Sequence, residues 1–138
     1  MLEAVESLIE NEEAAADLLM DRLLERDGQV GLLLRVLRRR PEVFVPHVMH
    51  GTRLYHAPKA VDPKTAELAA VAAAAALMCE HCLDAHMRAA RHKGATLEEI
   101  FDVLLIAGAI AESSTLSVAF RKFRQLEGKP ADSETGED

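Results

Sequence analysis

Two cysteines and a histidine lie close together in the middle of the chain, in the pattern Cys79-x-x-Cys82-x-x-x-His86. On a helix, which turns by about 100° per residue, the three side chains fall within a sector of about 60°. The nucleophile in cysteine chemistry is the thiolate, and a nearby base or helix N-terminus raises the thiolate fraction. His86 lies one turn after Cys82 and is placed to act as that base, directly or through a water. The pattern therefore indicates thiol redox chemistry, in which Cys79 can close a disulfide once Cys82 is oxidised.

Two further residues can join this group. Glu67 lies about 120° away from the cysteine sector if one helix runs from residue 67 to residue 79. A break in that helix can bring Glu67 back, and its carboxylate would then orient His86 or take its proton. His81 lies between the two cysteines and can help to hold either one.

The residues alone leave three interpretations of the pair open. The redox dithiol is favoured. A zinc site is the second interpretation, but two cysteines and one histidine supply three ligands where a structural site usually needs four. In the third interpretation the two cysteines are simply small buried hydrophobic residues, beside a core histidine whose hydrogen bonds are made within the protein. Elsewhere His47, His50 and His56 resemble a ligand cluster, but we interpret them as surface or interface histidines.

The composition sets limits on function. The chain has 138 residues, of which 49% are hydrophobic and 28% charged, as expected of a soluble globular protein. A net charge of -7 argues against nucleic acid as the main partner. The N-terminus is acidic where a signal peptide would be basic, and no apolar run approaches the roughly 20 residues of a membrane span. We therefore expect a cytoplasmic protein without a membrane partner, in which two cysteines do not serve as a structural staple.

The spacing of apolar residues predicts an all-α fold of six to seven helices. Helices are expected over residues 2–26 and 29–39, from Pro41 onward, over 63–93 with a break near 78–81, and from residue 97 onward. Asp62 and Thr96 are predicted N-caps, Thr96 in a capping box with Glu99, and Gly94 is a predicted helix stop. Ser113 or Ser114 is expected to cap a last, separate helix.

These elements predict one compact domain over residues 1–127. Residues 1–40 form its N-terminal helices and residues 41–126 its core, while the acidic tail 128–138 is predicted to be disordered. The segment 100–110 carries more large apolar residues than one buried helix face needs. We therefore expect an oligomer that buries this segment.

Four segments together resemble a known family. They are residues 62–68 with Glu67, residues 78–86 with both cysteines, His81 and His86, and residues 88–90 and 93–100. They resemble the carboxymuconolactone decarboxylase superfamily and, within it, the alkylhydroperoxidase D-like branch. The signature of that branch is a glutamate followed by Cys-x-His-Cys-x-x-x-His. The resemblance covers about residues 41–126.

The resemblance implies an all-helical fold that assembles as homo-trimers or homo-hexamers. We expect neither a cofactor nor a bound metal. It implies that Cys82 attacks a hydroperoxide, that Cys79 is the resolving thiol, and that Glu67 and His86 form a proton relay to Cys82, with His81 as an accessory. The implied reductant is a dithiol carrier such as a lipoylated protein. The characterised alkylhydroperoxidase has two related helical halves, whereas this chain has one motif-bearing unit.

Three functions are therefore carried forward. The first is a thiol-dependent peroxidase or disulfide oxidoreductase that cycles between dithiol and disulfide at Cys79 and Cys82. The second is a lyase acting on a small lactone-like acid, with Glu67 and His86 as acid and base. The third is a non-enzymatic oligomeric redox sensor or a protein clipped by zinc.

Overall fold

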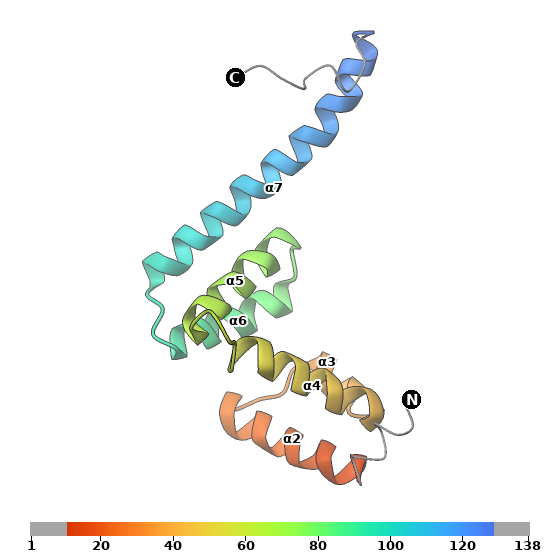
Figure 1. Cartoon of the computed structure of the whole chain (residues 1–138), viewed down its shortest axis with the longest axis vertical. Helices are drawn as coiled ribbons and strands as arrows, with labels where there is room; N and C mark the ends of the chain where they lie inside the picture. The colour runs from red at the N-terminus through yellow and green to blue at the C-terminus, as the bar shows by residue number, and fades with distance from the viewer. Residues whose placement is uncertain (1–10, 129–138) are drawn as a thin grey trace. The chain divides into compact units, whose positions relative to one another are not determined.

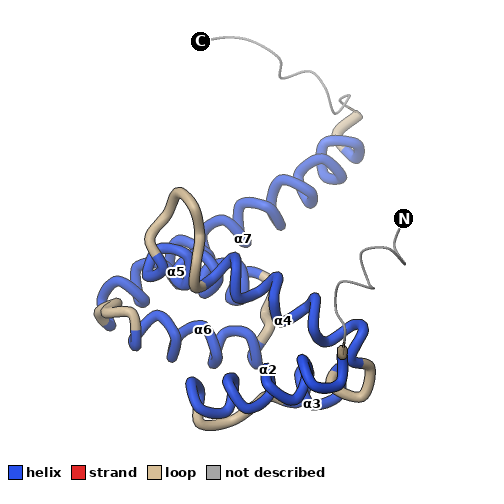
Figure 2. The backbone as a smooth tube through the Cα atoms, turned by 60° about the horizontal axis from the view of Figure 1, so that its bottom comes forward, coloured by secondary structure: helices blue, strands red, loops and turns tan. Residues whose placement is uncertain are grey.

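A computed structural model describes residues 11–128 of the chain. Within these residues the protein is made only of helices and loops (Figure 2), as the apolar spacing predicts. The helices, labelled in Figure 1, are α2 (Glu12–Asp27), α3 (Leu32–Leu37), α4 (Pro41–Tyr55), α5 (Pro63–Ala76), α6 (Glu80–His92) and α7 (Leu97–Leu126).

The contacts between residues divide the chain into two compact units, one ending at Ala66 and the other beginning at Glu67. The first unit contains α2, α3 and α4. Its core is formed where Phe44, Val45 and Val48 of α4 pack with Ala16 and Leu23 of α2. The side chain of Phe44 is fully buried, so this cluster is the apolar centre of the unit.

The second unit carries the cysteine motif. Its core consists of Ala90 on α6, Ala95 in the following loop and Ile100 on α7. Leu68, Met87 and Leu104 pack around these three residues. Most of the buried residues are small, which lets helices approach closely and brings polar side chains of α5 and α6 within hydrogen-bonding distance of each other.

The break predicted within residues 63–93 lies at Leu77–Cys79, between α5 and α6. The N–H of Cys79 donates to the carbonyl of Ala74, and the N–H of Met78 donates to that of Ala75, a pattern that ends helices with one left-handed residue. That residue is Met78, with φ of 52°, and it is 90% exposed. A glycine usually fills this position, which explains why the sequence alone did not fix the break.

The caps predicted around α5, α6 and α7 are confirmed. Asp62 accepts a hydrogen bond from the backbone N–H of Thr65 at the start of α5. Gly94, with φ of 86°, follows the end of α6. Thr96 and Glu99 form the capping box of α7, each side chain accepting the other's backbone N–H.

The separate last helix expected after Ser113 or Ser114 is wrong. One helix of 30 residues, α7, runs without interruption from Leu97 to Leu126. A capping residue must leave the helical conformation, and nothing in this stretch forces it to do so because no proline follows Gly108 within the helix. Thr115 illustrates the alternative, since its hydroxyl donates to the carbonyl of Ala111 one turn earlier in the helix.

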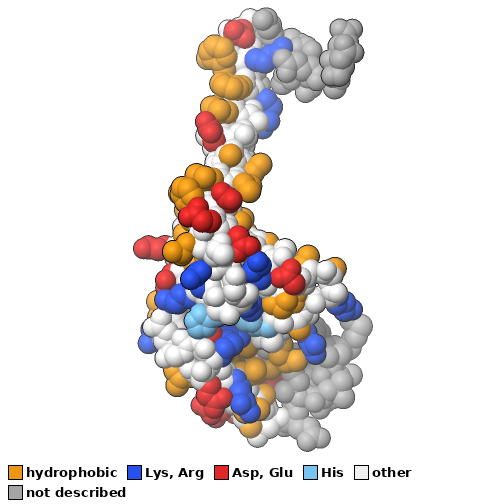
Figure 3. Space-filling view, turned by 90° about the vertical axis from the view of Figure 1, so that its left-hand side faces the viewer, with side chains coloured by type: hydrophobic (Ala, Val, Ile, Leu, Met, Phe, Trp, Pro, Cys, Tyr) orange, Lys and Arg blue, Asp and Glu red, His pale blue; other side chains and the backbone are white. Residues whose placement is uncertain are grey.

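The sequence contains no uninterrupted apolar run of about 20 residues, but one helix of residues 11–128 meets the looser criteria of length and mean composition for a membrane span. α7 is long and apolar enough to cross a membrane by these two criteria, and only 6% of its most apolar window is buried. Apolar side chains are exposed along the helix, as Figure 3 shows. The large ones are Leu97, Phe101, Leu105, Ile106, Ile110, Leu116, Val118, Phe120, Phe123 and Leu126.

Two predicted helices near the N-terminus differ in extent from their elements in the structure. The first was expected over residues 2–26, of which the structure describes residues 11–26 and places 12–26 in α2, with Asn11 as its N-cap. The second, expected over 29–39, is the shorter α3, whose N-cap is Gly31. Residues 129–138 of the predicted disordered tail lie outside the described part of the chain.

Candidate active site

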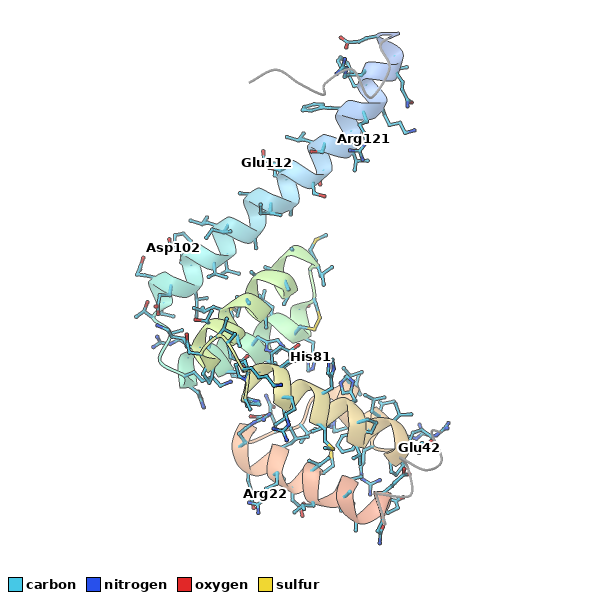
Figure 4. All side chains as sticks on the ribbon, in the orientation of Figure 1. Arg22, Glu42, His81, Asp102, Glu112 and Arg121 are labelled. Carbon is cyan, nitrogen blue, oxygen red and sulfur yellow. A yellow bond between two sulfur atoms is a disulfide. The ribbon has the colours of Figure 1, made fainter. Side chains whose placement is uncertain are left out.

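Cys79 and Cys82 are joined by a disulfide at the loop between α5 and α6. Their Cα atoms are 5.3 Å apart. Cys79 is the N-cap residue of α6, and Cys82 lies in the first turn of the same helix. Figure 4 shows the sulfur–sulfur bond at this loop, with His81 labelled at the start of α6. The spacing predicted from sequence therefore places the two sulfurs in direct contact.

The sulfur of Cys79 takes the place that a serine or aspartate oxygen takes in most helix caps. It accepts a hydrogen bond from the backbone N–H of Cys82 at 3.4 Å. The N-terminus of a helix also carries a partial positive charge that favours an anion. Both effects stabilise negative charge on Cys79 when the disulfide is opened. Both cysteine residues are partly exposed.

Glu67 and His86 lie on different helices and contact each other. Glu67 is on α5 and its side chain is 1% exposed, whereas His86 is on α6 and its side chain is 21% exposed. Oε2 of Glu67 lies 2.8 Å from Nδ1 of His86. The break between α5 and α6 thus brings Glu67 to the histidine, as expected if the helix did not continue.

Lys93 is a member of the site that the sequence analysis missed. It is the C-cap residue of α6, and its Nζ lies 2.6 Å from Oε1 of Glu67. The side chain of Lys93 is 20% exposed. In the sequence Lys93 stands directly before the helix stop Gly94, so it reads only as part of a helix end. That position does not indicate a buried partner on another helix. We refer to Glu67, His86 and Lys93 together as the Glu67 cluster.

The Glu67 cluster holds its carboxylate in the ionised form. Burial is the largest single influence on the pKa of Glu67 and raises it, but the hydrogen bonds and the charges of His86 and Lys93 together outweigh burial. The net pKa of Glu67 is therefore lower than its ordinary value of 4.5. A carboxylate only accepts hydrogen bonds, so Nδ1 of His86 carries the hydrogen that it shares with Glu67. The acceptor of the neutral ring is then Nε2, the atom that can act as a base.

His81 and the three histidines of the first unit lie outside this hydrogen-bonded cluster. His81 is exposed in the first turn of α6, next to the disulfide. His47 and His50 are exposed on α4, and Nε2 of His56 lies 2.7 Å from Nη1 of Arg26. Across residues 11–128 no group of three or more His, Cys, Asp or Glu side chains is arranged to hold a metal ion.

The arrangement combines three chemical capacities in one short hairpin. A pair of sulfurs already within bonding distance can accept and release two electrons. A helix N-terminus stabilises a thiolate on one of them. One turn further along α6, a histidine oriented by a buried carboxylate can accept a proton from a thiol or from a bound molecule.

Comparison with known proteins gives this site a family context. The structure is similar to the alkylhydroperoxidase AhpD core from Rhodospirillum rubrum, with a TM-score of 0.68, 26% sequence identity, and coverage of 78% of this chain and 81% of that chain. The sequence is 29% identical over 76 residues to the "Uncharacterized protein 4 in cox locus" of Paracoccus denitrificans, a match that covers 55% of this chain and 68% of the relative. The family model of the carboxymuconolactone decarboxylase family matches residues 46–125, which include the disulfide and the whole Glu67 cluster. The chain therefore belongs to the carboxymuconolactone decarboxylase family.

Proposed function

We propose that this protein is a thiol-dependent peroxidase that reduces hydroperoxides through a dithiol–disulfide cycle at Cys79 and Cys82. The observation that carries the proposal is the disulfide at the N-terminus of α6, one turn before a histidine that is hydrogen-bonded to a buried carboxylate. The similarity to the alkylhydroperoxidase AhpD core supports the choice of a hydroperoxide as substrate.

In the first step the thiolate of Cys82 attacks one oxygen of the hydroperoxide, ROOH. The O–O bond breaks, Cys82 becomes a sulfenic acid, and the alcohol ROH leaves after taking up a proton. His86 is the base that accepts the proton of the Cys82 thiol before the attack, and it returns that proton to the leaving alkoxide. Glu67 keeps the histidine in the tautomer that this transfer requires.

In the second step the thiolate of Cys79 attacks the sulfenic sulfur of Cys82. The S–O bond breaks, water leaves after protonation, and the disulfide forms. An external dithiol then reduces the disulfide and becomes a disulfide itself, so the two electrons given to the peroxide are restored. The N–H of Cys82 and the start of α6 make Cys79 the better leaving group, so the attack of this dithiol falls on Cys82.

The test is peroxide consumption with a small dithiol as reductant. Wild type is expected to turn over, and Cys82→Ser is expected to lose activity. With peroxide but no dithiol, Cys79→Ser is expected to form the sulfenic acid at Cys82 and then to accumulate sulfinic acid, which mass spectrometry detects as added oxygen. The proposal fails if wild type is inert with alkyl and hydrogen peroxides, or if Cys82→Ser consumes peroxide as fast as wild type.

A second function is supported by the Glu67–His86 pair alone. The pair is an acid–base unit that does not need the sulfurs, and the family takes its name from a decarboxylase. In this case the protein would be a lyase acting on a small lactone-like acid. Both Cys79→Ser and Cys82→Ser would then retain full turnover of that acid, and loss of turnover in either variant would argue strongly against the lyase.

We also propose that α7 is covered by further copies of this chain in a homo-oligomer. The apolar side chains exposed along α7 need a partner, and Asp102 and Glu112, labelled in Figure 4, interrupt its apolar stretch. Each charge costs about 3 kcal/mol at a bilayer centre, so a protein partner fits the helix better than a membrane. Light scattering should give a trimer or hexamer. A monomer at micromolar concentration, or flotation of the protein with lipid vesicles, would contradict this proposal.

A further inference from the structure

Lys93 joins the end of α6 to a carboxylate on another helix. As the C-cap residue of α6 it is followed by Gly94, whose left-handed φ of 86° turns the chain away from the helix. From there its Nζ reaches Oε1 of Glu67 at 2.6 Å. With 1% of the Glu67 side chain and 20% of the Lys93 side chain exposed, water screens this ion pair only weakly.

The two oxygens of Glu67 have different partners. Oε1 lies against Lys93 and Oε2 lies against His86. If the histidine were the only partner of Glu67, burial would favour the state in which the pair holds an extra proton, either on the imidazole or on the carboxyl group, because that proton offsets the negative charge. The positive charge of Lys93 offsets it without a proton. The pair therefore does not need a proton to compensate for burial, and His86 can give its proton up.

Charged residues also lie one turn from the cluster on α5 and in the first turn of α7. α5 carries Glu67 and, one turn earlier, Lys64, while α6 and its cap carry His86 and Lys93. α7 packs against α6 within this unit through the apolar residues Ile100 and Leu104. In the first turn of α7, Glu99 accepts a hydrogen bond from the backbone N–H of Thr96.

We propose that Lys93 is a positioning residue of the redox site, which holds Glu67 as a carboxylate and so allows His86 to act as a base. In this role Glu67 orients the imidazole and does not itself carry the proton taken from Cys82. The inference rests on the proposed peroxidase for its catalytic meaning, but the titration that it predicts belongs to the folded protein and can be measured without turnover.

The experiment follows the imidazole of His86 by NMR as pH is varied, in the oxidised protein. Lys93→Met is expected to raise the pH midpoint at which the Glu67–His86 pair loses its proton by about one unit or more, the size of effect that a neighbouring opposite charge has on a carboxyl group. Lys93→Arg keeps the positive charge and should restore a midpoint close to that of wild type. The matched control is Arg88→Met, which removes an exposed cation of the same helix that is paired with Asp84 at 2.9 Å. Equal midpoints in Lys93→Met and wild type would overturn the proposal.

A second measurement needs only wild type and does not depend on Lys93→Met folding. The carboxyl carbon of Glu67 is expected to keep the chemical shift of a carboxylate throughout the His86 titration and to change only at lower pH. If that carbon titrates together with His86 or above it, Glu67 carries the proton and the proposal is overturned.

Alkylation of the reduced protein links the titration to the site. The rate at which iodoacetamide modifies Cys82 should rise with pH at a higher midpoint in Lys93→Met than in wild type, and the Arg88→Met profile should match that of wild type. If Lys93→Met shifts the alkylation profile but the wild-type protein consumes no peroxide, the role of Lys93 is supported and the proposed peroxidase activity is excluded. If the protein is an active peroxidase but Lys93→Met leaves the titration and alkylation profiles unchanged, the peroxidase is supported and the role of Lys93 is overturned.

Discussion

Glu67 and His86 are 19 residues apart in the chain, yet Oε2 of one lies 2.8 Å from Nδ1 of the other. The distance is short because α5 ends at Ala76 and α6 starts at Glu80. The loop between these helices also carries the disulfide, so one change of chain direction brings together both the two sulfurs and the Glu67–His86 pair.

Replacing Glu67 with Gln should lower the rate of peroxide consumption by about 10²-fold, the lower end of what general base catalysis contributes. The amide no longer requires Nδ1 of His86 to carry the hydrogen, so Nε2 is no longer fixed as the acceptor. Initial rates at saturating dithiol measure the effect. Glu98→Gln, an exposed site in the first turn of α7, is the control. Equal rates in wild type and Glu67→Gln would show that the carboxylate does not support the reaction.

The stability of the fold should fall in acid partly because of Glu67. Its pKa is lower in the folded chain than its ordinary value of 4.5. Ionisation of Glu67 therefore stabilises the folded state at pH values above its ordinary pKa. This stabilisation is lost as the pH falls through the lower pKa of the folded chain. Urea unfolding between pH 7 and pH 3 should show the loss in wild type and a shallower one in Glu67→Gln. Parallel pH profiles in the two proteins would contradict the assignment.

Met78 and Gly94 both have left-handed backbones after a helix, and they should respond to substitution in opposite directions. Met78→Gly should raise the free energy of unfolding by about 1 kcal/mol, because a side chain in this conformation costs about that much. Its own side chain is 90% exposed and gives up little packing. Gly94→Ala should lower the free energy of unfolding by about the same amount. Thermal unfolding measures both, and a loss of stability in Met78→Gly would refute the strain at that position.

Reducing the disulfide should leave the helices intact. The bond closes a loop between residues separated by 3 positions, and constraining so short a loop stabilises a protein by about 2 kcal/mol. Far-ultraviolet circular dichroism should therefore be the same with and without reductant, with a modest drop in the midpoint of thermal unfolding. A protein that unfolds at room temperature on reduction would have a structural disulfide and could not use it in a cycle.

Much of the fold follows from local patterns in the sequence. Asp62, Thr96 and Gly94 mark helix ends through interactions made within a few residues, and all three act as predicted. Ser113 and Ser114 failed as signals because serine caps a helix only where the backbone leaves it, and their surroundings favour helix on both sides. The exact break at Met78 was also beyond local patterns, since methionine has no preference for the conformation it adopts there.

The site was predictable where it depends on spacing along one helix. Cys79, Cys82 and His86 share α6 or its cap, so their proximity follows from the period of the helix. Glu67 lies close to His86 only because the loop after α5 reverses the chain. Lys93 belongs to the site only because it contacts the Glu67 carboxylate from the end of another helix. Such contacts depend on how α5 and α6 pack, which composition and periodicity do not specify.

The burial of Glu67 has a consequence for the ionic strength at which the protein works. Arg38 pairs with Glu13 and Asp17, whose side chains are 68% and 71% exposed, and dissolved salt weakens interactions of this kind. The Glu67 cluster is shielded from ions, so its proton affinity should be nearly the same in dilute buffer and in concentrated salt. In the proposed peroxidase cycle, the activation of Cys82 by His86 should therefore change little with ionic strength.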